Sequence, residues 1–249
     1  MKIKLFFILL GLSYGLFTYY LFGGWWNSSV GTLLILLFSY LIWNKDFLKQ
    51  IGLKLDLKTI VKALILAGLV LICSLLLMKY IANKHNIQIS FSNWGNYYHD
   101  IFYIINEEIV IGSISLFALV NNYKIKPIIA SIGLAVVFAL IHFIFYKWFF
   151  DDKGLIGITT LISLFLIGFV RNNLILQTRH IAYSWALHFG WMAIMFGSMH
   201  IDMQTNLRVQ EHERFNLYLG SIEIVIISII LTGLSVLLQA KRYWSNMKI

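Results

Sequence analysis

Four residues that can carry charge or transfer protons lie inside long apolar stretches. Glu107 and Glu108 are adjacent in IFYIINEEIVIGSISLFALV, and His142 and His188 occur in two further apolar stretches. An ionised carboxylate at the centre of a bilayer costs about 2.5 to 3.5 kcal/mol even on a lenient insertion scale, so such a group usually faces a partner or a water-filled cavity. We therefore expect a polar site inside a membrane protein.

These side-chain types suit several chemistries. A carboxylate and imidazoles can position and deprotonate a water molecule, and they can stabilise the oxyanion that forms when the water attacks a carbonyl group. A glutamate and two histidines can also hold zinc with one position open for water, or relay protons in a proton-coupled transporter. Either histidine alone is more often a hydrogen-bonded packing residue, so the grouping of all four carries the prediction.

Helical geometry places the four residues in one layer. At 1.5 Å of rise per residue, Glu107, His142 and His188 lie roughly 12, 9 and 13 Å from the outer ends of their apolar stretches. Consecutive helical positions diverge by about 100°, so Glu107 and Glu108 cannot both point into the same site. The spacing predicts that three helices bring polar groups together at a common depth.

The elements that must position these side chains are membrane helices. Hydrophobic residues make up 59% of the 249 residues and charged residues 12%, with a mean hydropathy of +0.78, whereas a soluble domain is about one quarter charged. We predict an all-α polytopic bundle, a single integral membrane domain over residues 1–249. The lone cysteine, Cys73, excludes an internal disulfide and a thiolate zinc cluster. Eight apolar runs have the length needed to span a bilayer, near residues 5–22, 28–43, 59–83, 99–120, 128–148, 155–170, 181–198 and 218–239.

The net charge of +9 follows membrane topology and does not indicate a nucleic-acid partner. With the amino terminus inside, the inner connections and tails carry 14 of the 20 Lys and Arg residues, and the outer connections carry six. Arg171 is counted among the 14, in the connection after the sixth span. By the positive-inside bias we expect both termini in the cytoplasm and membrane lipid as a partner.

Three motifs, each on its own predicted span, resemble the family of CAAX proteases and bacteriocin-processing intramembrane proteases, which includes the type II CAAX prenyl endopeptidases and the Abi proteins. The family pattern has paired glutamates with an arginine five positions after the first, then F-x-x-x-H, then H-x-x-x-N. The resemblance covers residues 95–200, which we expect to form a family-like catalytic core. In this chain the motifs are Glu107-Glu108, Phe138 to His142, and His188 to Met192.

The resemblance implies a peptidase that hydrolyses a membrane-associated or lipidated peptide. Glu107 and His142 would position and activate the water, His188 would help to stabilise the oxyanion, and Glu108 would support this arrangement. Zinc would be held by Glu107, His142 and His188, although the same residues suffice for a metal-free glutamate mechanism. The family and the predicted topology together imply a bacterial cell membrane and an exported peptide as substrate.

The chain departs from the family pattern at two positions. Gly112 replaces the arginine, which removes the cation expected beside the glutamates, and Met192 replaces the asparagine. Losing an oxyanion donor lowers turnover by roughly 10²- to 10³-fold, although the indole N–H of Trp191 could take over that role. These departures favour a second hypothesis, a weakened or inactive member of the fold that acts as a membrane scaffold or regulator. We expect Phe138 to be a packing residue that fixes the face of its helix.

Overall fold

The chain is helical almost throughout, which confirms the predicted all-α class. The computed structural model describes residues 2–20, 26–53, 56–87, 89–91, 97–144, 155–195, 201–203 and 211–246. Within these ranges the only strands are β1 (Ile89–Phe91) and β2 (Ile201–Met203), which form one short antiparallel pair.

The helices alternate in direction along the bundle. The long ones are α1 (Lys2–Tyr20), α2 (Trp26–Trp43), α4 (Leu57–Lys84), α7 (Pro127–Ile144), α8 (Ile158–Thr178), α9 (Ala182–Met195) and α11 (Ile222–Asn246). Between α4 and α7 one composite helix consists of α5 (Tyr97–Glu107), the π-helix η3 (Glu108–Ile114), α6 (Ser115–Phe117) and the π-helix η4 (Ala118–Asn122). The short elements are the 3-10 helix η1 (Asn44–Asp46), α3 (Phe47–Gln50) and α10 (Glu211–Tyr218).

Six helices within the described ranges are long and apolar enough to cross a membrane. They correspond to the second to sixth and the eighth of the predicted spans. The seventh corresponds to α9, whose 14 residues rise about 21 Å, less than a hydrocarbon core of roughly 30 Å. The ends of the first, fifth and seventh predicted spans, at residues 21–22, 145–148 and 196–198, lie outside the described residues.

The predicted end of the sixth span at residue 170 is wrong, because α8 continues to Thr178. The sequence Arg171-Asn172-Asn173 looks like the start of a polar connection, yet all three side chains are buried. The Asn172 side-chain amide donates to the backbone carbonyl of Ser131 at 2.9 Å, and that of Asn173 donates to the Ser235 hydroxyl at 3.1 Å. Polar residues persist in a membrane helix where neighbouring helices satisfy their hydrogen bonds.

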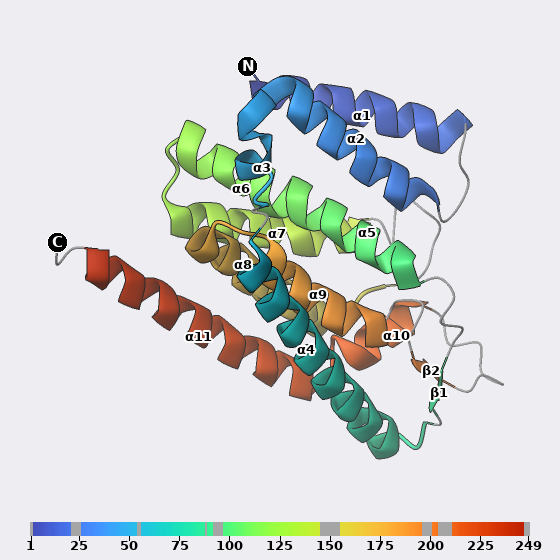
Figure 1. The fold of residues 1–249 in the computed structure, drawn as a ribbon. Helices are drawn as coiled ribbons and strands as arrows, with labels where there is room; N and C mark the ends of the chain where they lie inside the picture. Colours follow the sequence, from blue (N-terminus) through green and yellow to red (C-terminus); the bar gives the residue numbers. More distant parts are fainter. Residues whose placement is uncertain are drawn as a thin grey trace.

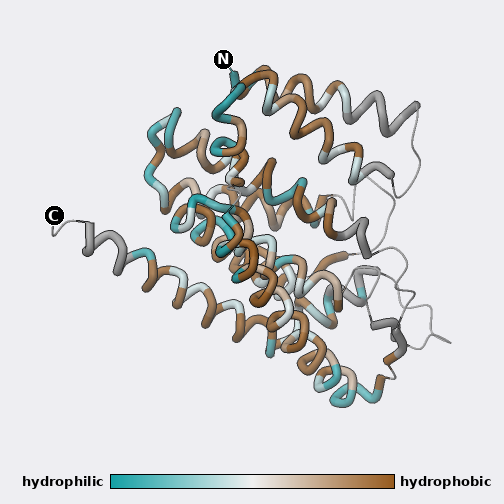
Figure 2. Tube along the Cα trace, in the orientation of Figure 1, coloured by the Kyte–Doolittle hydropathy of each residue, from teal (hydrophilic) through white to brown (hydrophobic). Residues whose placement is uncertain are grey.

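The bundle brings the helices that carry the predicted site residues to its centre. The start of α1 and the end of α11 lie at the same end of the molecule (Figure 1). Hydrophobic residues follow the helices, and hydrophilic residues gather toward the helix ends (Figure 2). The most extensive packing is between α4 and α9, between α7 and α8, and between α8 and α11, while α5 packs against α2 and α9. Thus α5, α7, α8 and α9 surround a common interior.

A glycine turn after α3 fixes the connection between α8 and α9. Gly52 has a φ of +68°, and a Cβ there would lie 3.0 Å from Cβ of Ser113 and 3.1 Å from Cγ2 of Ile181. The Ile181 N–H donates to the Gly52 carbonyl at 2.8 Å, and the Ser113 hydroxyl donates to the Ile51 carbonyl at 2.7 Å. Only glycine meets both the left-handed backbone and the close packing. The turn therefore ties the start of α9 to η3.

Candidate active site

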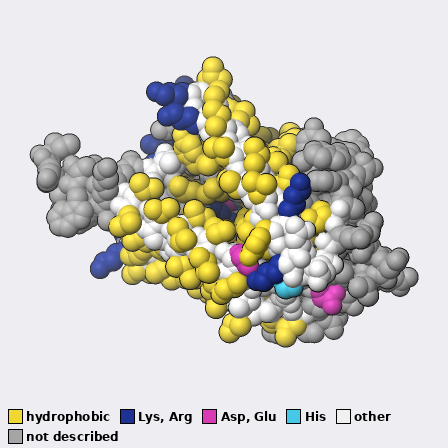
Figure 3. All heavy atoms as spheres, turned by 90° about the horizontal axis from the view of Figure 1, so that it is seen from below, with side chains coloured by type: hydrophobic (Ala, Val, Ile, Leu, Met, Phe, Trp, Pro, Cys, Tyr) yellow, Lys and Arg dark blue, Asp and Glu magenta, His cyan; other side chains and the backbone are white. Residues whose placement is uncertain are grey.

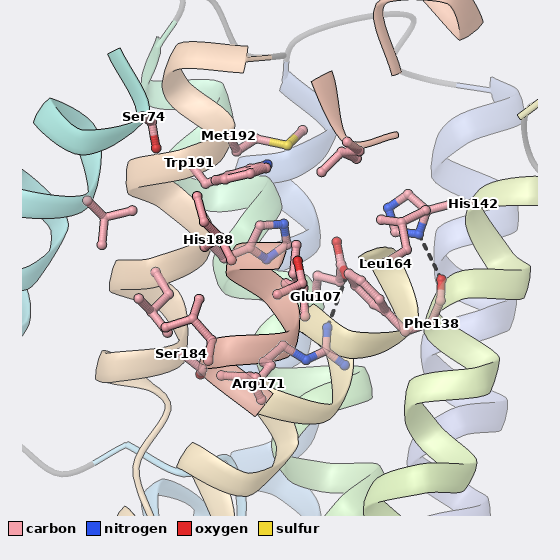
Figure 4. Close-up of a pocket in the computed structure, with 18 of the residues that line it drawn as sticks. Ser74, Glu107, Phe138, His142, Leu164, Arg171, Ser184, His188, Trp191 and Met192 are labelled. Atoms are coloured by element: carbon pink, nitrogen blue, oxygen red, sulfur yellow. Dashed lines mark hydrogen bonds and ion pairs between the residues drawn. The ribbon is translucent and has the colours of Figure 1, made fainter. Parts of the chain in front are cut away.

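A cavity of about 840 Å³ lies among α4, α5, η3, α7, α8, α9 and α11. Most of its walls are apolar, and Glu107, His142, Arg171 and His188 all line it (Figure 4). Three of these are predicted site residues from three different helices. Arg171 was not among the predicted site residues.

The two glutamates occupy different environments, as expected from their adjacent helical positions. Glu107, the last residue of α5, lines the cavity, and 10% of its side chain is exposed. Glu108, the first residue of η3, is fully buried. Short π-helical segments inside helices occur frequently at functional sites. Here the change from α- to π-helix falls between the two carboxylates.

Arg171 corrects two predictions. We expected it in a connection, but its side chain is only 4% exposed, and its Nη1 lies 3.2 Å from Glu107 Oε1 and 3.8 Å from Glu108 Oε1. We also expected the glutamates to lack a cation because position 112 is glycine. The cation is present and comes from α8. The sequence signal was the position of Arg171 directly after a long apolar run, which is equally typical of a helix end.

Hydrogen bonds fix the orientation of both histidine rings. Nδ1 of His188 lies 3.0 Å from Glu108 Oε1, and Nδ1 of His142 lies 2.8 Å from the Phe138 carbonyl oxygen. Because both partners are acceptors, Nδ1 carries the proton and donates in each ring. Nε2 is therefore the nitrogen that remains for chemistry in each histidine.

The Phe138 ring contacts three of the polar side chains of the site. It is buried as expected for a packing residue, and in addition its ring lies under the Arg171 guanidinium, with 4.3 Å between Cζ and the ring centroid. The ring also meets His142 edge-on at 4.7 Å and His188 at 6.2 Å between centroids. A cation above an aromatic face is attracted by the ring quadrupole, more strongly where water is excluded. Both fixed residues of the F-x-x-x-H motif, Phe138 and His142, thus belong to the site.

Zinc binding by Glu107, His142 and His188 stays a prediction. Within the described part of the chain, no three His, Cys, Asp or Glu side chains are grouped so that they could hold a metal ion. The carboxylates are instead engaged with Arg171 and His188. These contacts suit the acid–base chemistry that the sequence predicts.

Met192 and Trp191 both line the cavity beside His188, as their helical spacing predicts (Figure 4). At the position of the family asparagine the cavity wall therefore carries a thioether, which is at most a weak acceptor and donates no hydrogen bond. Among these neighbours on α9, the indole of Trp191 carries an N–H donor.

One family of known proteins matches the part of the chain that carries this site. A family model described as type II CAAX prenyl endopeptidase Rce1-like matches residues 98–194, an interval that contains Glu107, His142, Arg171 and His188. No curated protein and no solved structure matches the chain. The match and the apolar helices are consistent with an intramembrane protease fold of the CAAX type. Over residues 98–194, less than half of its length, the chain is similar to the type II CAAX prenyl endopeptidase Rce1-like family.

Proposed function

We propose that the protein is an intramembrane endopeptidase that cleaves a membrane-held peptide by a glutamate- and histidine-assisted attack of water. The observation that supports this most is the combination on one cavity wall of Glu107, paired with Arg171, and two histidines whose Nδ1 atoms are occupied. A base, a water-positioning group and an oxyanion donor are the parts that peptide hydrolysis requires.

Each side chain has a defined task in this mechanism. Nε2 of His142 accepts a hydrogen bond from the attacking water, and Glu107 removes one of its protons as the water oxygen bonds to the scissile carbonyl carbon. His188, protonated on both nitrogens, donates one N–H to Glu108 and the other to the oxyanion. When the C–N bond breaks, Glu107 returns the proton to the departing amine, which leaves a carboxylic acid and an amine as products.

The cavity favours a substrate that is largely apolar. Leu69 and Cys73 of α4 and Ile227 and Leu231 of α11 line it opposite the polar wall. Figure 3 looks onto this side of the molecule and shows hydrophobic side chains around a hollow. Such walls suit the lipid anchor or the apolar residues of a peptide embedded in the bilayer, and they keep bulk water from the reacting groups.

Met192 supports a second candidate function, a non-catalytic scaffold or regulator that retains the fold. If no group replaces the donor expected at this position, the oxyanion is under-stabilised and turnover falls by roughly 10²- to 10³-fold. The two candidates differ in what they require of Glu107. A catalytic base is essential to the peptidase, whereas a scaffold needs only the fold.

The decisive experiment is cleavage by the full-length protein in lipid nanodiscs. Two quenched-fluorescence peptides serve as probes, one with a farnesylated cysteine in a C-terminal CAAX sequence and one with an N-terminal palmitoyl chain. We expect one of them to be cleaved and Glu107→Gln to reduce the rate by about 10²- to 10⁴-fold, the usual contribution of a general base. Glu213→Gln, at an exposed glutamate of α10, is the matched control and should retain the wild-type rate.

Cleavage at equal rates by wild type and Glu107→Gln would reject the mechanism. Absence of cleavage of both probes by a folded wild-type protein would instead favour the scaffold. In that case Glu107→Gln should leave any cellular phenotype of the protein unchanged.

A further inference from the structure

We infer that Arg171 is the positioning residue of the glutamate pair and that Gly112 is what allows it to reach them from α8. Its electrostatic role stands on the geometry alone, while its effect on turnover rests on the proposed function. No other Lys or Arg among the described residues forms an ion pair with Glu107 or Glu108.

The packing at Gly112 couples the two positions. A Cβ at Gly112 would lie 2.7 Å from Cδ1 of Ile175 and 3.4 Å from Oε2 of Glu108. Ile175 is fully buried and lies one helical turn after Arg171. Any side chain at position 112 would therefore require the terminal methyl group of the buried Ile175 to shift. With glycine there, α8 packs directly on η3 and its guanidinium enters the space beside the carboxylates.

The charges explain why a cation is needed here. Two adjacent carboxylates in a site of low dielectric cannot both stay ionised unless a cation compensates them. Nη1 of Arg171 lies near both glutamates, Cζ lies 4.3 Å from the centroid of the Phe138 ring, and Nη2 donates to Asn172 Oδ1 at 3.5 Å. A lysine would supply the charge but not the branched set of donors that makes these contacts together. Arg171 therefore fixes the direction of the Glu107 carboxyl group.

Modification by dicyclohexylcarbodiimide tests this role independently of cleavage, because this apolar reagent reacts with protonated carboxyl groups. The nanodisc protein is treated at neutral pH, and modification of Glu107 is measured by peptide mass spectrometry. We expect no modification in the wild type, strong modification in Arg171→Met and partial modification in Arg171→Lys. Arg179→Met, at an arginine near the end of the same helix whose guanidinium lies over Phe117, should behave like the wild type.

A measurement at low pH and a second variant make each outcome decisive. Wild-type Glu107 should become modified once the pH is low enough to protonate it, which shows that the reagent reaches it. If it does, and Glu107 of Arg171→Met still resists the reagent at neutral pH, the inference is overturned. If Arg171→Met does not fold, Arg171→Gln replaces it, because its amide can still contact Asn172.

Relocation of the cation tests the coupling to Gly112. The triple variant Gly112→Arg, Arg171→Met, Ile175→Ala places the charge on η3 and removes the obstructing side chain, so Glu107 should again resist the reagent. Gly112→Arg alone should fold poorly, because Ile175 occupies the space. Continued modification of Glu107 in a folded triple variant would contradict the proposed exchange.

In the cleavage assay, Arg171→Met should lower kcat on the order of 10²-fold with KM changed by less than about twofold, since the substrate contacts remain. If KM rose on the order of 10²-fold and kcat stayed unchanged, Arg171 would act in substrate binding and the positioning role would be rejected. If the wild type cleaves neither probe, the proposed function fails, and the carbodiimide result still decides what Arg171 does.

Discussion

At the scale of single residues, Phe138 stands out because one aromatic ring meets the guanidinium and both imidazoles. These contacts lie at 4.3, 4.7 and 6.2 Å from the ring centroid. A leucine of similar volume fills the space but has no quadrupole to attract the cation. The site therefore depends on the aromaticity of Phe138 and not only on its size.

We predict that Phe138→Leu destabilises the protein by about 2 kcal/mol, the value of a desolvated cation–π contact. Cleavage should fall as well, because Arg171 and His142 lose a fixed neighbour. Chemical unfolding in detergent and the rate with the farnesylated probe measure the two effects. Phe138→Tyr keeps the ring face and should fall between wild type and Phe138→Leu, so equal stability of the leucine variant and the wild type would contradict the contact.

At the scale of elements, the close packing of α4 on α9 determines where His188 lies. Ala63, Ala67 and Ala186 form a buried cluster at this interface, and a Cβ at Gly190 would lie 2.7 Å from the Ala67 carbonyl oxygen and 2.8 Å from Cβ of Val70. Small residues let membrane helices approach closely. Glycine at position 190, two residues from His188, is part of how the histidine is positioned.

We predict that Gly190→Ala destabilises the fold by about 1 to 3 kcal/mol, the usual range for overpacking. This exceeds the roughly 0.5 to 1 kcal/mol that alanine gains over glycine in a helix. Gly68→Ala in α4 is the matched control, because nothing lies within 4 Å of its added Cβ. The control should be neutral or slightly more stable in thermal unfolding, and equal behaviour of the two variants would argue against the close approach.

The start of α4 provides a prediction about pH. The Thr59 hydroxyl donates to Asp56 Oδ2 at 2.6 Å and the Lys58 N–H donates to Oδ1 at 3.2 Å, and the Thr59 bond in particular holds the pKa of the Asp56 carboxyl below its ordinary value. A lowered pKa stabilises the folded state above the ordinary carboxyl pKa, and this contribution is lost as the pH falls through the lowered value. The cap therefore acts at neutral pH.

Asp56→Ala should accordingly lower Tm at pH 7, and its difference from the wild type should shrink at about pH 3. Thermal unfolding in a detergent of constant composition measures both values. Asp46→Ala is the control, because the Asp46 side chain makes no capping bond at the start of α3. A difference that persists unchanged into acid would show that the cap does not depend on the ionised carboxylate.

At the scale of the whole molecule, α4 and α11 flank the apolar side of the cavity. They are tied at one end by the ion pair between Lys84 Nζ and Glu223 Oε1 at 2.8 Å. Farther along, Cys73 of α4 is exposed and also lines the cavity. Because an exposed residue also lines the cavity, we expect an entrance between these helices.

We predict that an apolar maleimide added to the nanodiscs modifies Cys73 and blocks cleavage of the farnesylated probe, because the adduct fills the entrance. Cys73 is the only cysteine of the chain, so Cys73→Ala is the control. This variant should cleave the probe normally, and the maleimide should not block its cleavage. Faster labelling by a charged, membrane-impermeant maleimide than by the apolar one would place the entrance toward water instead.

Sequence reasoning anticipates the helices and the predicted site residues because apolar run length and residue type are local properties. It misses Arg171, since its partners are 64 and 63 residues earlier in the chain and no local pattern distinguishes a buried ion pair from a helix end. For the same reason, the sequence suggests only that Gly112 removes the arginine of the family pattern. The structure shows that the side chain of Ile175, from another helix, occupies the space beside Gly112.

The π-helical η3 determines where a change of chain length can be absorbed. Its i→i+5 hydrogen bonds accommodate an extra residue within the turn that follows Glu107. In an ordinary helix, the loss of one residue rotates everything before it by about 100° relative to everything after it. Between positions 109 and 114, a deletion would instead restore an ordinary helix and leave the helix on either side facing as before. We therefore expect the loss of one residue to be tolerated better in η3 than inside α7 or α8.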